Sequence, residues 1–184
     1  MNRVHLFVVP LLAIGCAGAA ERVTPAPAPA PAQVEIQTLI DELYAVISGP
    51  AGQERDWARM RELFAPGARL SPMVRQLPSD SLATGPRPAM MILTVEDYIE
   101  RAGPMLMRDG FFETEIHSVM ERYGNVAHVW STYESRIVSP DSEPVDRGIN
   151  SIQLVYGEGR WWVYSILWHS ERAGAGSIPA DYLP

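Results

Sequence analysis

The hydrophobic period of the chain changes once, near Phe111, and this change constrains the fold more than any other feature. Before Phe111, apolar residues recur every three or four positions, which is typical of amphipathic helices. After it, apolar and polar residues alternate in long segments separated by glycine-containing turns, as in antiparallel strands. We therefore expect an α+β domain in which three N-terminal helices cover one face of a sheet.

Three helices are expected before the change of period. The first ends at the Ser-Gly-Pro sequence of residues 48–50. The second begins after Asp56, a residue type that caps helices well. The third begins at a capping box formed by Thr94 and Asp97 and ends at Gly103. Five apolar residues at helical spacing place one face of the first helix in the core: Ile36, Leu39, Ile40, Leu43 and Ile47.

Two hairpins are expected after the helices. The first turns at Gly124 and Asn125, so that Tyr123 pairs with Val126 and Ser118 with Ser131. In this register the face expected to meet the helices holds Phe112, Thr114, Ile116, Ser118, Met120, Val129, Ser131, Tyr133, Ser135 and Ile137. The face expected to meet solvent or a partner holds Glu113, Glu115, His117, Val119, Glu121, His128, Trp130, Thr132, Glu134 and Arg136. A bulge would exchange the faces for part of a strand.

The second hairpin, residues 147–156 and 160–169, is almost continuously apolar. Strands of this composition need cover on both faces. The helices can cover one face, and a second copy of the chain or the C-terminal tail is expected to cover the other. The sequence therefore predicts a homodimer through the outer sheet face.

Residues 1–20 have the order of an export signal: Arg3, an apolar run at residues 6–14, then small residues. The run is shorter than the roughly 20 residues that span a membrane. Residues 13–16, Ala-Ile-Gly-Cys, resemble the lipobox of bacterial lipoproteins, in which the cysteine, here Cys16, is acylated, although Ala13 replaces the usual leucine. The alternatives are ordinary cleavage after residues 17–19 and a cytosolic protein without a signal. The expected location is the bacterial cell envelope, either lipid-anchored or periplasmic.

Residues 21–33 form a second segment, in which proline alternates with alanine from residue 25 to residue 31. This pattern favours extended, solvated backbone. We expect a disordered tether between the signal and the domain. Residues 34–184 then have the length of one domain.

The composition excludes several classes of function. The chain contains no lysine, which removes Schiff-base chemistry and phosphate loops that need that residue, and its only cysteine is Cys16. The formal charge of −7 and the lack of a basic run argue against nucleic acid as a partner. The domain histidines lack metal-ligand spacing, so no metal and no cofactor are expected.

Local motifs connect the predicted topology to a family. Arg55, Asp56 and Trp57, followed by residues 63–68, resemble the helix-two signature of the NTF2-like, or SnoaL-like, cone-fold superfamily. Residues 159–163 and 168–170 resemble its last strand. The resemblance implies three N-terminal helices packed on a strongly curved, mainly antiparallel sheet. It says little about activity, because the fold hosts dehydratases, isomerases and binding proteins.

Two functions remain open, and only the second would make the chain an enzyme. The first is binding of a small apolar or amphipathic ligand in the cone, because the expected inner face carries hydroxyl groups and no carboxylate. The expected ligand-binding residues are Tyr44, Trp57, Tyr98, Ser118, Ser131 and Tyr133.

The second function is a SnoaL-type lyase or isomerase acting by general acid/base catalysis on a small organic substrate. In the isomerase relatives a tyrosine on helix one donates to an oxyanion, and Tyr44 occupies the matching place. Their catalytic aspartate is replaced by Ser71 or Pro72, which leaves His169 or a carboxylate as the candidate base, with Tyr44 or Tyr133 as the hydrogen-bond donor. Tyr44 and His169 also have structural explanations, as a half-buried helix tyrosine and a core histidine.

Overall fold

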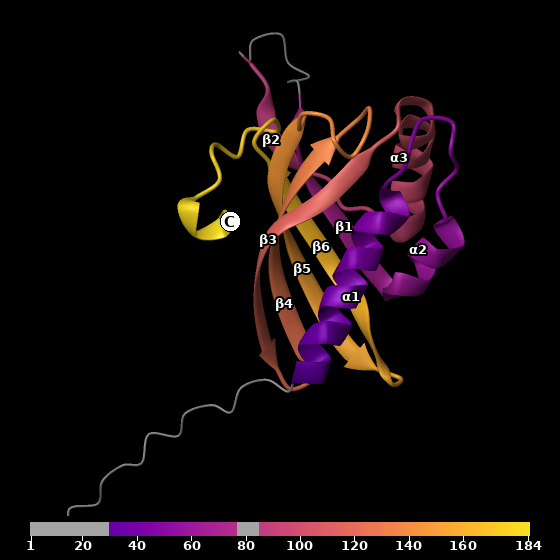
Figure 1. Ribbon diagram of the computed structural model, residues 1–184, viewed down its shortest axis with the longest axis vertical. Coiled ribbons are helices and arrows are strands. Elements are labelled where there is room, and N and C mark those ends of the chain that lie inside the picture. Colours follow the sequence, from indigo (N-terminus) through magenta and orange to yellow (C-terminus); the bar gives the residue numbers. More distant parts are fainter. Residues whose placement is uncertain (1–29, 77–84) are drawn as a thin grey trace, which may run out of the picture.

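The computed structural model describes residues 30–76 and 85–184. In Figure 1 three helices lie on one side of a sheet and the C-terminal segment lies on the other, which confirms the α+β class. The elements are α1 (Ala30–Ile47), α2 (Trp57–Leu63), β1 (Phe64–Gln76), β2 (Arg87–Met90), α3 (Val95–Asp109), β3 (Phe112–Tyr123), β4 (Val126–Arg136), β5 (Asp146–Gly157), β6 (Arg160–Ser170) and the 3-10 turn η1 (Ala180–Tyr182).

The sheet has six strands in the order β2-β1-β6-β5-β4-β3. The two predicted hairpins, β3–β4 and β5–β6, are present, and β1 runs parallel to β6, so the sheet is mixed. The strong curvature expected from the family resemblance is not found; the sheet stays open rather than curling into a deep cone (Figure 1). Curvature depends on where bulges fall, and the alternation of residue types does not show their positions.

Two of the three helices begin as the sequence predicts. Asp56 accepts a hydrogen bond from the backbone N–H of Arg59 at 2.8 Å. Thr94 and Asp97 form the expected capping box at the start of α3. The predicted end of α3 at Gly103 is wrong, because the helix continues through Pro104. Pro104 lies on the exposed face of α3, where water can hydrate the carbonyl that loses its helical partner.

The first hairpin keeps its predicted register only from the turn to the His117–Thr132 pair. Ile116 is then skipped, and Glu115 pairs with Tyr133. This bulge turns the beginning of β3 by one residue, which exchanges its two faces. The expected outward orientation of Glu113 and Glu115 is therefore wrong, and both side chains face the helices.

One hydrophobic core fills the space between the helices and the inner sheet face. Its apolar stripe on α1 is the predicted one, and all five of the predicted side chains are buried. The larger side chains that are almost inaccessible come from both layers: Ile36, Ile40, Met60, Leu63, Leu106, Val129, Ile152 and Val163. Burying these side chains ties each helix to the sheet.

Arg55 joins the ends of α1 and α3. Its buried guanidinium donates to the backbone carbonyls of Ile47 at 2.9 Å, Gly49 at 2.6 Å and Leu106 at 3.2 Å. A Cβ atom at Gly49 would lie 2.9 Å from Nη1 of Arg55, so only glycine leaves room for this contact. The loop after α1 is thereby held against the C-terminal half of α3.

The C-terminal segment crosses the outer face of the sheet. The hydroxyl of Thr132 donates to the carbonyl of Tyr182 at 2.8 Å, and the rings of Trp130 and Tyr182 lie edge to face at 6.1 Å. No helix in the described part of the chain is both long enough and apolar enough to span a membrane.

Candidate functional site

A cavity of about 220 Å³ lies between α1, α3 and the inner face of the sheet. Ten of its lining side chains are apolar or aromatic without a hydroxyl: Leu43, Ile47, Met60, Leu70, Ala102, Met105, Leu106, Phe111, Ile166 and Trp168. The other four are Tyr44, Tyr98, Glu113 and Asn150. An apolar enclosure with a few polar groups is typical of a site for small molecules.

Each polar group reaches the cavity from a different element. Tyr44 comes from α1 and Tyr98 from α3. Glu113 reaches it because of the bulge in β3, and Asn150 projects from β5 beside Trp168 of β6. The ring of Tyr98 lies edge to face with that of Trp168 at 6.4 Å, which fixes one wall.

A chain of hydrogen bonds leads from the cavity to the surface of α1. Asn150 Nδ2 donates to Tyr44 Oη at 3.0 Å, and Tyr44 Oη lies 2.6 Å from Ser131 Oγ. Ser131 in turn donates to Glu115. On the far side, Gln37 Nε2 donates to Glu115 Oε1 at 2.9 Å. Ser131 is completely buried, so these hydrogen bonds form a polar network inside the otherwise apolar core.

Glu113 is the cavity group whose charge depends on pH near neutrality. Although the residue as a whole is only half-buried, burial of its carboxyl group raises the pKa to about 8, with the amide of Asn150 acting in the opposite direction. Most Glu113 side chains are therefore neutral at pH 7 and can donate a hydrogen bond. Burial also raises the pKa of Tyr44 and of Tyr98, so both hydroxyls stay protonated.

Comparison with known proteins identifies the fold. Neither a protein-family model nor a curated protein matches the chain. Among solved structures, a protein of unknown function with a cystatin-like fold from Nostoc punctiforme is similar with a TM-score of 0.56 and 14% identity, over 82% of this chain and 96% of that one. An NTF2-like protein with a cystatin-like fold from Novosphingobium aromaticivorans has a TM-score of 0.56 and 12% identity, over 82% and 87%.

The chain has the NTF2-like fold. A third similar structure, called a putative scytalone dehydratase and also from Novosphingobium aromaticivorans, has a TM-score of 0.53 and 11% identity, over 83% of this chain and 91% of that one. At these identities the similarity concerns the fold alone. What this NTF2-like domain does must therefore be argued from its own cavity.

The predicted ligand-binding residues of the NTF2-like domain separate into two groups. Tyr44 and Tyr98 line the cavity, and Ser131 lies directly behind Tyr44. Tyr133 is buried on the same sheet face, where a Cβ atom on Gly148 would lie 2.6 Å from its hydroxyl. Ser131 and Tyr133 thus support the cavity without lining it.

The remaining predicted positions lie away from the cavity. Ser118 is half-buried on β3 and does not line it. Trp57 packs against Gly103 in a groove between α2 and α3, at the edge of the core and away from the cavity. His169 projects from the opposite face of the sheet to Trp168, beneath the C-terminal segment, so it cannot act as a base in the cavity. Helical spacing and strand alternation predicted the element and the face on which each of these side chains lies, but not whether that face lines the cavity.

Glu113, Glu115, Asn150 and Trp168 are the functional candidates that sequence reasoning missed. The two glutamates continue the alternation of β3 without a break, and glutamate ordinarily faces solvent. Asn150 and Trp168 lie in strands that are almost continuously apolar. Without alternation, the sequence does not show which sheet face each of these residues occupies. No local signal marks the bulge at Ile116.

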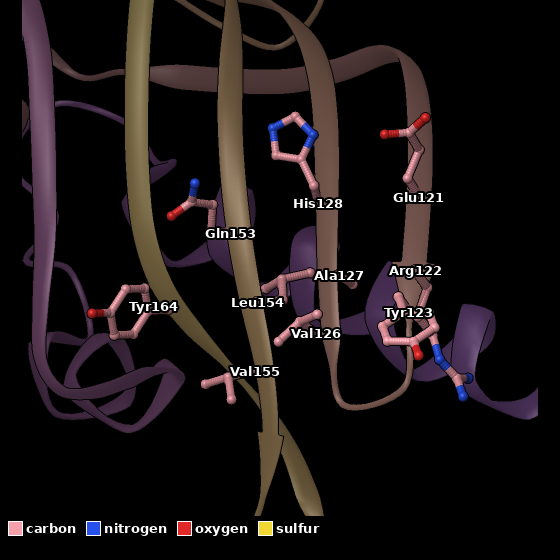
Figure 2. A pocket seen from close by; sticks show the side chains of 10 residues that line it. All are labelled: Glu121, Arg122, Tyr123, Val126, Ala127, His128, Gln153, Leu154, Val155 and Tyr164. Atoms are coloured by element: carbon pink, nitrogen blue, oxygen red, sulfur yellow. The ribbon is translucent and has the colours of Figure 1, made fainter.

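The outer sheet face has a second, more open hollow of about 560 Å³ near the β3–β4 turn. Figure 2 shows its side chains spread along several strands rather than converging on a point. Val126 and Tyr164 remain about half exposed there, at 54% and 56%. This composition is that of a contact surface rather than of a reaction site.

Proposed function

We propose that this domain binds a small, mainly apolar molecule that carries one polar group in the cavity between α1, α3 and the sheet. The observation that carries the proposal is the enclosure itself, with hydrocarbon on most of its wall and four polar side chains. A cavity of 220 Å³ exceeds the roughly 150 Å³ that holds benzene and is smaller than the roughly 300 Å³ at the lower end of drug-sized sites. A ligand of about one ring fits this volume.

The polar side chains indicate how the ligand is oriented. At neutral pH the hydroxyl of Tyr98 and the neutral carboxyl group of Glu113 are hydrogen-bond donors. A ligand oxygen placed between them would accept from both. The rest of the ligand would then lie against Trp168 and the aliphatic wall.

Calorimetric titration with cyclohexanol tests the proposal. Ala102 lines the cavity, and Ala102→Leu would fill part of it, so we expect the affinity to fall about tenfold or more. Ala58→Leu makes the same change on the exposed face of α2 and should leave the affinity unchanged. Equal affinity in all three proteins, or no binding of any one-ring alcohol or ketone, would contradict the proposal.

A second candidate function, proton transfer as in a lyase or isomerase, is favoured by one observation. Glu113 has a pKa of about 8 in the same cavity as the hydroxyl of Tyr98. A general base is most effective when its pKa is near the operating pH. Glu113 would remove a proton from a carbon beside a carbonyl group while Tyr98 donates to the carbonyl oxygen, and the proton would return to the product.

Exchange of the α-hydrogens of cyclohexanone in deuterated water tests this second function without knowledge of the natural substrate. The exchange should be faster with the protein than without it, and the rate should rise with pH until Glu113 is fully ionised. Glu113→Gln should abolish the acceleration, whereas Glu121→Gln, on the exposed outer face, should retain it. Exchange that Glu113→Gln does not slow would remove Glu113 as the base.

We also propose that the domain is exported and held at a bacterial membrane through an acylated Cys16. Cys16 lies outside the described residues, and the support is the sequence pattern around it. Intact-mass measurement of protein from the membrane fraction should show acyl chains on a chain that begins at Cys16. A chain that begins after residues 17–19 and carries no acyl mass would instead indicate a periplasmic protein.

A further inference from the structure

The chain of hydrogen bonds behind the cavity has a direction. Among the described residues, the amide of Gln37 and the hydroxyl of Ser131 both donate to Glu115, one to each carboxylate oxygen. A carboxylate only accepts hydrogen bonds. The single proton of Ser131 is therefore committed to Glu115.

This commitment fixes the hydroxyl of Tyr44. Since Ser131 has no second proton, the 2.6 Å contact between its Oγ and Tyr44 Oη requires Tyr44 to donate. Asn150 Nδ2 can only donate, so the 3.0 Å contact from Asn150 is accepted by the Tyr44 oxygen. Tyr44 lines the cavity, and because its proton points to Ser131 its oxygen has one acceptor position left beside the bond from Asn150.

We propose that Glu115, acting through Ser131, holds Tyr44 as a hydrogen-bond acceptor, so that the cavity selects a hydroxyl group over a carbonyl group. This inference rests on the proposed binding of a small polar-tipped ligand and names the polar group. A ligand hydroxyl can accept from Tyr98 or from neutral Glu113 and can donate to Tyr44. A carbonyl oxygen can make only the first kind of contact. Glu115 and Ser131 are accordingly positioning residues for specificity, since neither lines the cavity.

Cyclohexanol and cyclohexanone form a matched pair of probes, because they have nearly the same size and differ in one donated hydrogen. The native protein should prefer the alcohol by about threefold to tenfold, which corresponds to one ordinary hydrogen bond. Ser131→Ala removes the acceptor of the Tyr44 proton, which then turns to the cavity and favours the ketone. We expect the alcohol-to-ketone ratio of affinities to fall by about the same factor.

Glu115→Gln provides an independent route to the same change. The amide that replaces the carboxylate can donate to Ser131, which frees Ser131 to donate to Tyr44 and leaves the Tyr44 proton for the ligand. Tyr44→Phe removes the acceptor outright and should also lower the ratio. Ser165→Ala and Glu121→Gln, on the outer sheet face, are the matched controls and should keep the native ratio.

The outcomes separate the two proposals. If neither probe binds the native protein, the proposed ligand binding fails. If both bind but the ratio stays within twofold in Ser131→Ala, Glu115→Gln and Tyr44→Phe, the binding stands and the role of Glu115 is overturned. Thermal unfolding of each variant, measured beside the ratio, distinguishes selectivity from stability, because a purely structural role would lower the affinity for both probes together.

Discussion

At the residue scale, the feature that distinguishes this domain is a carboxyl group that is desolvated in a mainly apolar cavity. Glu113 has no cation beside it among the cavity-lining residues, so desolvation of its charged form is the main influence on its pKa. The neutral form is retained at pH 7 and acts as a donor. Groups with a strongly shifted pKa in a cavity are candidates for functional sites, because catalysis and ligand recognition use such shifts.

Glu113 should make the stability of the protein depend on pH. The folded protein keeps the proton on Glu113 up to a pKa of about 8, whereas the unfolded chain releases it near 4.5. Because the folded state binds more protons in this interval, this contribution is greatest below about pH 4.5 and is lost as the pH rises to about 8. Urea denaturation at about pH 5, 6.5 and 8 measures this loss of stability.

The variant Glu113→Gln should lose this contribution, so its stability relative to the native protein should increase between pH 5 and pH 8. Glu121→Gln is the control for a change of net charge, since Glu121 is exposed on the outer face. A difference between Glu113→Gln and the native protein that stays constant over this range would mean that Glu113 is not buried in its neutral form.

Arg55 is the residue on which the arrangement of α1 and α3 most depends. Its guanidinium donates to five backbone carbonyls, those of Pro50 and Gln53 in addition to the three named above, and a lysine has too few donors and the wrong geometry to replace it. We expect Arg55→Lys to lower the free energy of unfolding by about 2 kcal/mol. Arg59→Lys, at an exposed arginine paired with Glu42 and Glu62, should change it by less than about 0.5 kcal/mol.

At the element scale, the position of Tyr98 depends on how α3 begins. The capping box satisfies two backbone N–H groups, of Thr94 at 2.9 Å and of Asp97 at 3.1 Å, one turn before Tyr98. Thr94→Ala should therefore cost about 1 kcal/mol of stability in chemical denaturation. Thr38→Ala on α1, where the hydroxyl donates only to the carbonyl of Val34, should cost much less. Equal effects would show that the cap does not stabilise α3.

In the strands, local sequence patterns predict the turns but not the bulge. The β5–β6 turn forms at Glu158 and Gly159, both with positive φ, and the β3–β4 turn forms at the predicted Gly-Asn pair, because turn geometry is set by adjacent residues. The bulge at Ile116 is not local, since an extra residue in β3 is accommodated only against β4 and α1. Without the bulge, Glu113 and Glu115 would face outward and the cavity would lack its carboxyl group.

At the scale of the whole molecule, the outer sheet face is only partly covered. The C-terminal segment covers Thr132 and contacts Trp130, but Tyr123, Val126, Tyr164 and Leu167 remain exposed, as does part of Trp130. The hollow lined by Tyr123, Val126 and Tyr164 also carries the acidic side chain of Glu121. We propose that a second copy of the chain covers this face.

Sedimentation velocity tests the proposed homodimer. The native protein should sediment as a dimer at micromolar concentrations, and Tyr164→Glu should shift it to a monomer, because a buried unpaired charge is costly at an interface. Ala58→Glu on the exposed face of α2 should leave the dimer intact. A native protein that remains monomeric at ten times this concentration would contradict the proposal.

The sequence alone determined the three helices, the two hairpins after them, two of the helix caps and the turn at Gly124 and Asn125, because each depends on a few neighbouring residues, but it did not show that β2 lies before α3. It also placed Tyr44 and Tyr98 on the helix faces that meet the core. Only the tertiary structure decided that Glu113 and Asn150 join them, that His169 faces away from the cavity, and that the sheet stays open. These outcomes depend on bulge positions and on packing between layers, which join residues far apart in the chain.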